Sequence, residues 1–329
     1  MEFGLHAFFA LTTAFLVTFY LVPLFIKVAR KFGIMDCPDG GLKKHKAPTP
    51  YLGGLAIYVG LVVSMALVLP FEHPFFLFIF ASSILLFIGL LDDLVQLTPG
   101  QKFFGQFLAT LCYLKAGFYL KVAFFGSFWN IVISAFWFMV MSNAFNLIDV
   151  MDGLATTTAL SIACAYLIFA FLMGQQALCL LLLCFIGALL AFLWFNRPPA
   201  RIYLGDSGSL FFGGFLGCIP FTISWSEYND FGYLIPIIVS AVPLMEWGTL
   251  IVVRTYKGIA FYRGSPDHFS IYLQQNGWRK NAILGYVATM TAFAATVSLI
   301  FFYGILNWQE LAFLALFFMS LWFFFLLRR

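Results

Sequence analysis

The chain has 329 residues, of which 63% are hydrophobic and only 10% charged, and its formal net charge is +4. Soluble globular domains carry about 25% charged residues. This composition therefore excludes a soluble domain, and equally a disordered, collagen-like or nucleic-acid-binding chain. The sequence is typical of a protein that is surrounded by lipid.

Eleven segments are apolar enough to predict membrane-spanning helices, since a helix needs about 20 apolar residues to cross a bilayer. They cover residues 5–26, 51–70, 74–91, 103–119, 128–147, 154–173, 175–195, 209–225, 231–253, 282–304 and 308–327. The fourth and eighth segments are the weakest, and Gly174 marks a turn inside the long uncharged stretch. No separate soluble domain is evident. We expect an all-α polytopic membrane protein in which residues 1–329 form a single integral membrane domain.

The positions of Lys and Arg predict the orientation, because these residues collect in cytoplasmic loops. With the N-terminus outside, all of the 18 Lys and Arg lie on the inner side except Lys115 and Lys121. This asymmetry supports an odd number of spans and places the C-terminus in the cytoplasm.

Carboxylates gather on the same predicted side. Five of them adjoin span ends on three different loops: Asp92, Asp93, Asp149, Asp152 and Asp206. A carboxylate close to hydrocarbon is costly unless it is paired or binds a metal. Solvation of a helix end explains any one of them equally well, but five on one face favour a shared site.

Two adjacent carboxylates, Asp92 and Asp93, end the apolar run SSILLFIGLLDD. Like charges raise each other's pKa unless a cation lies nearby. The nearest candidate in the sequence is Lys102, at the start of the following span, although taken alone it better fits a lysine that extends toward the membrane surface. The pair predicts a metal site, a basic partner or a carboxylate that acts as a base.

A second polar motif, NLIDVMDG, spaces Asn146, Asp149 and Asp152 three residues apart. This spacing keeps side chains on one broad face of a helix. Their oxygen atoms suit a hard cation or the hydrogen-bond donors of a nucleobase and ribose.

A third motif places Asp206 between Gly205 and Gly208 in NRPPARIYLGDSGSLFFGG. Glycines let a backbone approach a phosphate, and the helix that follows would favour an anion at its N-terminus. In the same segment Tyr203 could stack on a base.

Basic residues and histidines lie on two further loops of this face. The first loop, KKHKAPTP, contains Lys46, and the loop before the tenth span contains His268, which could contact a diphosphate. The combination of carboxylates, cations and amide groups favours phosphoryl transfer on a membrane-embedded scaffold.

The motifs resemble those of the polyprenyl-phosphate N-acetylhexosamine-1-phosphate transferases. The resemblance runs from Asp36 to about Trp278, through DxPxxxxKxHxxPxPxxGG around His45, Asp92-Asp93 with Lys102, NAFNLIDVMDGLA and GDSGSLFFGG. It implies Mg²⁺-dependent transfer of a sugar-1-phosphate from a UDP-sugar to polyprenyl phosphate with release of UMP, Mn²⁺ being the alternative cation. The enzyme would lie in the bacterial inner membrane with its active site on the cytoplasmic face, and a homodimer would be one form of assembly.

The resemblance also implies roles for individual residues. Asp206 and Asn146 look like the metal ligands, and Lys102 is similar to the family's phosphate-contacting lysine. Together with Lys102, the catalytic set comprises Asp92, Asp93 and His268. The nucleotide- and substrate-binding set comprises Lys46, Asp149, Asp152, Asn196 and Tyr203.

One departure from the family pattern bears on the sugar. The branch that transfers phospho-N-acetylmuramoyl-pentapeptide carries consecutive histidines in its last long loop, whereas here SPDHFSIYL has His268 alone. Asp267 and Ile271 stand where other members often have His. The branch that transfers N-acetylglucosamine-1-phosphate carries two or more histidines there, so the single His argues against the pentapeptide substrate but leaves the sugar open. The eleven predicted spans favour N-acetylglucosamine-1-phosphate or a related sugar, with the pentapeptide substrate as the alternative.

A transporter is the competing class of protein, since transporters place charged residues in broken helices near the membrane centre. Glu246 is the one acidic residue deep within a predicted span, three residues after Pro243. A locally satisfied kink explains Glu246, and no internal repeat is evident, so the sequence favours the transferase.

Overall fold

The computed structural model describes residues 2–37, 48–70, 74–227, 229–260 and 264–327. The long helices are α1 (Glu2–Phe32), α2 (Gly53–Val68), α3 (Phe75–Val95), α4 (Pro99–Lys115), α5 (Gly126–Ile148), α6 (Leu154–Leu172), α7 (Gln176–Asn196), α8 (Gly205–Cys218), α10 (Ala241–Tyr256), α12 (Lys280–Phe302) and α13 (Trp308–Leu327). Two short helices, α9 (Ile235–Val239) and α11 (Phe269–Gln275), and four 3-10 turns, Ala123–Phe125, Ile219–Thr222, Trp225–Glu227 and Gly232–Leu234, complete the helical part. A small antiparallel ribbon pairs β1 (Met35–Asp36) with β2 (Thr49–Pro50).

The all-α class and the multi-pass membrane architecture predicted from the sequence are confirmed. A long helix lies on each of the eleven predicted segments. Within the described residues, six helices are long and apolar enough to cross a membrane, and a seventh span results if one bent pair counts as a single span. The weak fourth and eighth segments, α4 and α8, are not among those six. The count of eleven crossings therefore stays a prediction.

The ninth predicted span is bent by 71° between Gly232–Val239 and α10. Pro243 explains the break, because proline has no N–H to donate to the carbonyl four residues earlier and its ring clashes with that carbonyl. That carbonyl belongs to Val239, the last residue of α9. A kink at this point was expected from the sequence.

Two helices begin four residues before their predicted starts. The α4 helix begins at Pro99 because Thr98 forms a capping box with Gln101 and Pro99 occupies the first helical position. Lys102 therefore lies in the first turn of α4. Asp206, expected in a loop, lies in the first turn of α8.

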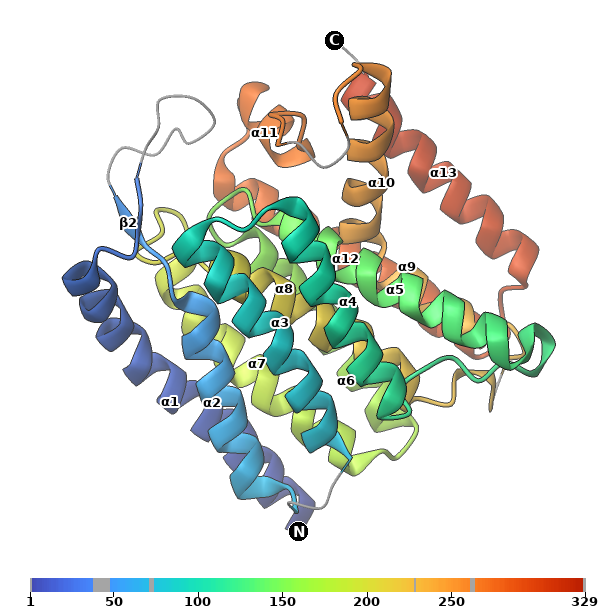
Figure 1. The fold of residues 1–329 in the computed structure, drawn as a ribbon. Helices are drawn as coiled ribbons and strands as arrows, with labels where there is room; N and C mark the ends of the chain where they lie inside the picture. Colours follow the sequence, from blue (N-terminus) through green and yellow to red (C-terminus); the bar gives the residue numbers. More distant parts are fainter. Residues whose placement is uncertain (1, 38–47, 71–73, 228, 261–263, 328–329) are drawn as a thin grey trace.

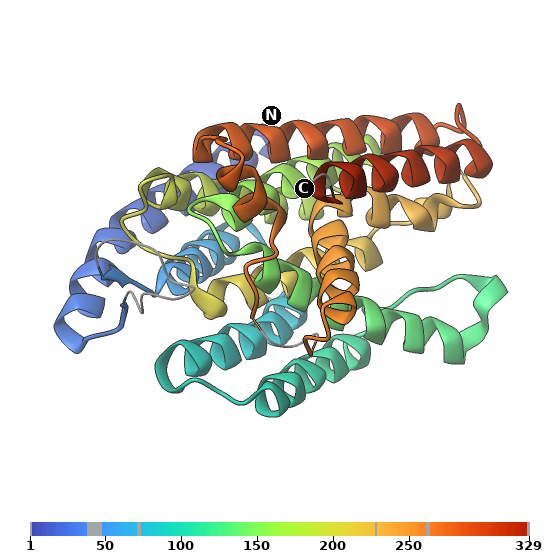
Figure 2. The same cartoon turned by 90° about the horizontal axis from the view of Figure 1, so that it is seen from above.

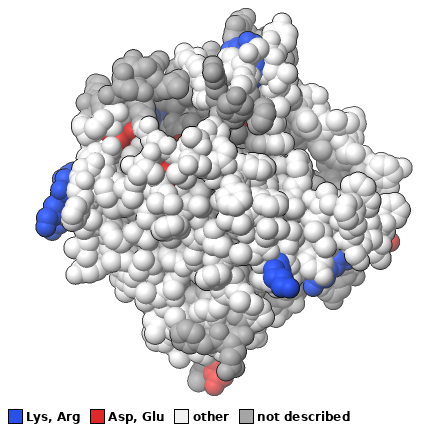
Figure 3. Space-filling model, in the orientation of Figure 1, with Lys and Arg blue, Asp and Glu red and all other residues white. Residues whose placement is uncertain are grey.

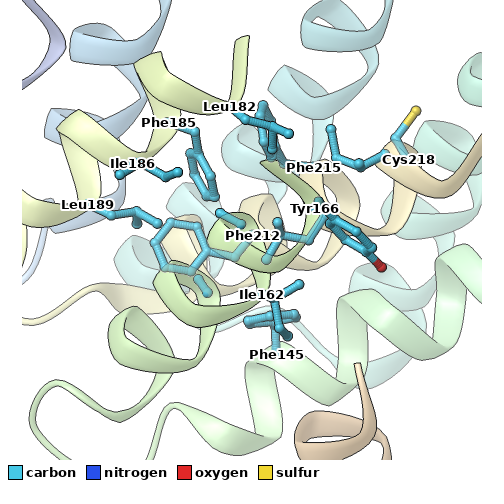
Figure 4. Packing of buried hydrophobic residues seen from close by; sticks show 14 of the residues in the cluster. Phe145, Ile162, Tyr166, Leu182, Phe185, Ile186, Leu189, Phe212, Phe215 and Cys218 are labelled. Atoms are coloured by element: carbon cyan, nitrogen blue, oxygen red, sulfur yellow. The ribbon is translucent and has the colours of Figure 1, made fainter. Parts of the chain in front are cut away.

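The core surrounds α8, whose side chains are buried from Ser207 to Cys218. It packs against α2, α3 and α5. Phe212 and Phe215 of α8 meet Phe185 of α7, with ring centroids 5.5 and 4.2 Å apart (Figure 4). A helix enclosed in this way is held by packing on every side, which fixes the position of its N-terminal residues.

The first turn of α1 and the last turn of α13 lie at opposite ends of the molecule (Figure 1). Seen from above, α12 and α13 run along one edge, and α3 and α4 along the opposite edge (Figure 2). Phe293 and Phe318 join α12 to α13 with ring centroids 4.8 Å apart.

Charged side chains are sparse on the face shown in Figure 3. Most of that face is uncharged, and acidic atoms are visible in a recess in its upper part. The broad uncharged surface is what a protein in contact with lipid presents.

Candidate active site

The ammonium group of Lys102 lies among polar side chains from three other helices. Its Nζ is 2.9 Å from Asp92 Oδ2 on α3, forms a salt bridge with Asp206 on α8, and donates to Asn146 Oδ1 on α5 at 3.3 Å. Asn146 Nδ2 in turn donates to Asp206 Oδ1 at 2.8 Å and to Ser209 Oγ at 3.1 Å. The structure thus brings together four residues that the sequence nominated, and Lys102 is not merely a lysine at the membrane surface.

The tight connection between α3 and α4 places Asp92 beside Lys102. The α3 helix ends at Val95, and the next residue, Gln96, has a left-handed conformation with φ of 54°. The backbone N–H of Leu97 donates to Asp92 Oδ1 at 2.7 Å. One carboxylate oxygen of Asp92 thus holds the turn, and the other faces Lys102.

Asp93 forms the N-terminal cap of α8. Its Oδ1 accepts the backbone N–H of Asp206 at 2.8 Å, and its Oδ2 accepts that of Ser207 at 3.1 Å. The first N–H groups of a helix have no partner within the helix, so this remote carboxylate lets α8 begin at Gly205. The anion favoured at this helix N-terminus is supplied by the protein itself.

Glycines bring the backbones of α2, α3 and α8 into direct contact. A Cβ atom on Gly89 would lie 2.3 Å from the carbonyl oxygen of Asp206, and one on Gly54 would lie 2.3 Å from the backbone nitrogen of Gly208. Gly205 has a φ of 77°, a conformation that favours glycine. The carboxylates of α3 and α8 can lie so close together only because Gly89 has no side chain between these two helices.

The NLIDVMDG motif does not remain on one helical face, which corrects that expectation. The α5 helix ends at Ile148, and the backbone then turns, with Val150 N–H donating to Ile148 O at 2.9 Å and Gly153 at a φ of 75°. Asn146 therefore faces Lys102 from the helix, whereas Asp149 and Asp152 lie beyond its end.

Asp149 has no hydrogen-bond or ion-pair partner among the described residues. Burial and the nearby carboxylates of Asp206, Asp93 and Asp152 raise its pKa well above the usual range. The acidic cluster around Lys102 thus holds more negative charge than this lysine neutralises.

Asp152 lies on the other side of the same loop. Its Oδ2 is 2.8 Å from Lys280 Nζ and accepts the backbone N–H of Ala200 at 3.4 Å. With Pro198, Pro199, Arg279 and Asn281, the two residues line an open hollow. Lys280 was not among the predicted site residues, because no local pattern in the sequence links it to Asp152, 128 residues earlier.

Asn196, only 3% exposed, holds two loops together. Its Oδ1 accepts from the Gly153 N–H at 3.1 Å and from Thr156 Oγ1 at 2.9 Å, and its Nδ2 donates to Ile202 O at 3.0 Å. These contacts give Asn196 a part in shaping the loop that carries Asp152.

Tyr203 joins the segment before α8 to the β2 ribbon. Its N–H donates to Pro50 O at 2.8 Å and its carbonyl accepts from the Gly53 N–H at 3.1 Å, while its ring lies 6.5 Å from that of Tyr51. Lys46, nominated for substrate binding, lies outside the described residues.

His268 is buried beside Glu246, apart from the group around Lys102. It is 5% exposed, and its Nδ1 is 2.8 Å from Glu246 Oε1. Glu246 is fully buried, so the expected satisfied kink is present, and the partner that satisfies it is the histidine of the α10–α11 loop.

The donor set suits a hard divalent cation. Mg²⁺ binds oxygen ligands and usually takes one or two carboxylates, with water and substrate phosphates completing its shell. Asp206 and Asn146 supply a carboxylate and an amide oxygen, and Asp149 adds a carboxylate that has no partner in the part of the chain that the structure describes. No group of three or more His, Cys, Asp or Glu within the described residues forms a metal cage by itself, so substrate oxygens would have to contribute.

Comparisons with known proteins bear on this arrangement. The model of the family described as glycosyl transferase family 4 matches residues 75–224, which include α3 to α8. The chain is 32% identical over 300 residues to the phospho-N-acetylmuramoyl-pentapeptide-transferase of Bacillus cytotoxicus, covering 80% of this chain and 88% of the relative. It is 30% identical to the same-named protein of Limosilactobacillus fermentum, covering 89% and 97%. It is 29% identical to a probable undecaprenyl-phosphate N-acetylglucosaminyl 1-phosphate transferase of Bacillus subtilis, covering 74% and 71%.

Proposed function

The chain belongs to glycosyl transferase family 4, and we propose that it transfers a sugar-1-phosphate from a UDP-sugar to polyprenyl phosphate and releases UMP. The chain is thus an enzyme of this family, and the transporter considered from the sequence is set aside. The observation that carries the proposal is the meeting of Lys102 with Asp92, Asn146 and Asp206 inside the matched region.

We propose that the enzyme lies in the bacterial inner membrane as a single domain, with the active site on the cytoplasmic side. The distribution of Lys and Arg supports this orientation. The donor would then arrive from water, and the lipid acceptor from the membrane, at the end of the bundle where α3 meets α4.

Asp206 and Asn146 would hold Mg²⁺, with Mn²⁺ as the alternative. When bound, the cation would neutralise charge on the diphosphate of the donor. The excess of carboxylates over cations around Lys102 supports a cation site here. Lys102 would bind phosphate oxygens as a fixed positive charge.

Asp92 is the better candidate for the base. Both oxygens of Asp93 accept backbone N–H groups of α8, whereas only one oxygen of Asp92 is used by the backbone. Asp92 would take the proton from the acceptor phosphate, whose oxygen then attacks the β-phosphorus of the UDP-sugar. The new P–O bond joins the sugar phosphate to the lipid phosphate, and the bond to the α-phosphate breaks to release UMP.

Asp149, Asp152 and Asn196 would recognise the nucleotide, with Tyr203 and Lys46 as further substrate contacts. Asp152 could reach a nucleotide only after its ion pair with Lys280 exchanges partners. Asp149 is already free of protein partners among the described residues, so it is the more accessible of the two carboxylates.

The covalent route is the mechanistic alternative, in which an aspartate is phosphorylated first and the lipid attacks second. Under direct attack, no sugar-phosphate adduct forms on the enzyme with UDP-sugar alone, and labelled UMP does not exchange into UDP-sugar without lipid. An adduct on Asp92 or Asp93, detected by mass spectrometry, would reject Asp92 as the base.

The sugar is tested by supplying purified protein with polyprenyl phosphate and a panel of UDP-sugars, and by measuring UMP. The eleven predicted spans favour UDP-N-acetylglucosamine as the donor, and the single His268 argues against the pentapeptide-bearing donor. The pentapeptide-bearing UDP-N-acetylmuramate is the second candidate, because the relatives with that activity in their names match with up to 97% coverage. Release of UMP from no member of the panel would reject the proposed function.

A further inference from the structure

A buried acid–imidazole pair links α10 to the start of α11. Glu246 is fully buried. Its Oε1 lies 2.8 Å from His268 Nδ1, and its Oε2 accepts the backbone N–H of Phe269 at 3.4 Å. His268 precedes α11 as its N-cap residue and is itself 5% exposed. Burial of such a pair is costly unless its geometry is well satisfied, so a function beyond filling space is expected.

The pair dictates how the imidazole is presented. Nδ1 donates to Glu246 when the carboxylate is ionised, because an ionised carboxylate can only accept hydrogen bonds. The other ring nitrogen, Nε2, has no hydrogen-bond partner among the described residues. A ring anchored through one nitrogen by a carboxylate keeps the other available, and the carboxylate stabilises the positive charge of a ring that donates from both.

Polar contacts anchor the rest of this loop to α10. Arg254 Nε donates to Ser265 Oγ at 3.0 Å, and Lys257 pairs with Asp267. Arg254 also interacts electrostatically with Asp267 and Glu246. These contacts hold the backbone just before His268 in place, so the orientation of the ring depends mainly on Glu246.

We propose that Glu246 is a positioning residue that orients His268 so that Nε2 binds a phosphate oxygen of the nucleotide diphosphate. The α11 helix, which His268 precedes, lies at the same end of the molecule as the turn between α3 and α4, where the Lys102 group is found (Figure 1). The inference rests on the proposed function for the identity of the ligand, a uridine diphosphate. It assigns to Glu246 a role beyond that of a satisfied kink.

The first test compares the affinities of the purified full-length protein for UDP and for uridine by titration calorimetry. His268→Asn places an amide N–H where Nδ1 was, so it retains a donor toward Glu246 but lacks Nε2. We expect this variant to fold normally and to bind UDP about 10- to 100-fold more weakly, with unchanged affinity for uridine. Unchanged affinity for UDP would overturn the proposal, and so would a failure of the wild-type protein to bind UDP.

The second test is a double-mutant cycle on the same UDP affinity. Glu246→Gln should weaken binding about tenfold in the wild-type protein and have no effect when His268 is already Asn, because a positioning residue acts only through its partner. A purely structural role would give equal losses in both backgrounds and would overturn the proposal. Glu246→Asp, which keeps the charge, replaces Glu246→Gln if the latter does not fold.

Glu310→Gln is the matched control for loss of a carboxylate. Glu310 accepts the Asn307 N–H at the start of α13 and is exposed. This variant should bind UDP as the wild-type protein does. The proposed function is tested separately, because these experiments measure binding and not turnover. If UDP affinity responds as expected but no UDP-sugar yields UMP, the proposed function is rejected and the role of Glu246 remains supported.

Discussion

Asp93 and Asp206 are 113 positions apart in the chain, yet the carboxylate of the first accepts the backbone N–H of the second at 2.8 Å. This contact assigns different tasks to the two adjacent aspartates at the end of α3. Asp93 fixes the start of α8, and thereby the position of the Asp206 side chain. Asp92 faces Lys102 with one oxygen, which is why we propose Asp92 for the proton transfer.

Asp92→Asn and Asp93→Asn should therefore fail in different ways. In Asp93→Asn, one of the two oxygens that accept the N–H groups of α8 becomes an amide NH₂, so one N–H loses its acceptor. A buried hydrogen-bonding group left without a partner lowers the stability by about 1–3 kcal/mol. We expect a lower Tm and lost activity for Asp93→Asn, but a Tm near that of the wild-type protein and lost activity for Asp92→Asn. Thermal unfolding in detergent and UMP release measure the two effects. Equal Tm values for the two variants would contradict this division.

Lys102→Ala should lose far more activity than Lys115→Ala. Lys102 contacts three polar side chains of the site, whereas Lys115 lies at the other end of α4. Loss of a fixed charge that faces a transferring phosphoryl group commonly lowers the rate about 10²–10³-fold. The measurement is kcat for UMP release, and similar losses in both variants would show that Lys102 does not touch substrate.

Asp206→Asn tests the cation site. The variant keeps the shape of the side chain but removes a charge that would bind Mg²⁺, so turnover should fall to the detection limit while the Tm changes little. Chelation of divalent cations should abolish UMP release by the wild-type protein, and added Mg²⁺ should restore it. A variant with near-normal turnover and unchanged Mg²⁺ dependence would show that the cation binds elsewhere.

Gly89→Ala tests the contact between α3 and α8. Its Cβ would meet the Asp206 carbonyl oxygen at 2.3 Å, and overpacking of this kind costs about 1–3 kcal/mol. We expect a lower Tm and reduced activity, because α8 must move away from Asp93. Gly285→Ala in α12 is the control, since its Cβ meets nothing within 4 Å, and alanine should stabilise that helix by about 0.5–1 kcal/mol. Equal effects of the two substitutions would count against the close packing.

The sequence predicted the elements and several members of the site, and local signals explain why. The length of each apolar segment was enough to predict a helix there. The proximity of Lys102 to Asp92 follows from the short loop between them. The TPGQ capping box that starts α4 was also present in the sequence, although the predicted start missed it. Pro243 likewise indicated the bend before α10.

Contacts between distant segments could not be predicted in the same way. The cap of α8 comes from Asp93 on another helix, so the sequence around Gly205 alone suggests a later start. The pairs Asp152–Lys280 and Glu246–His268 depend on which helices pack together, and neither spacing is a recognised motif. The spread of Asn146, Asp149 and Asp152 follows from the end of α5 at Ile148, which the regular spacing concealed.

The glycine contacts of α8 divide the site into a fixed part and an adjustable part. Because Gly54 and Gly89 bring α2 and α3 against the backbone of α8, Asp92, Asp93 and Asp206 belong to one rigid frame. Lys102 reaches this frame from α4 through a long, flexible side chain, and Asp149 lies in a loop. We therefore expect the lysine and the loop to adjust to the two proposed substrates, while the carboxylates of the frame keep their mutual distances.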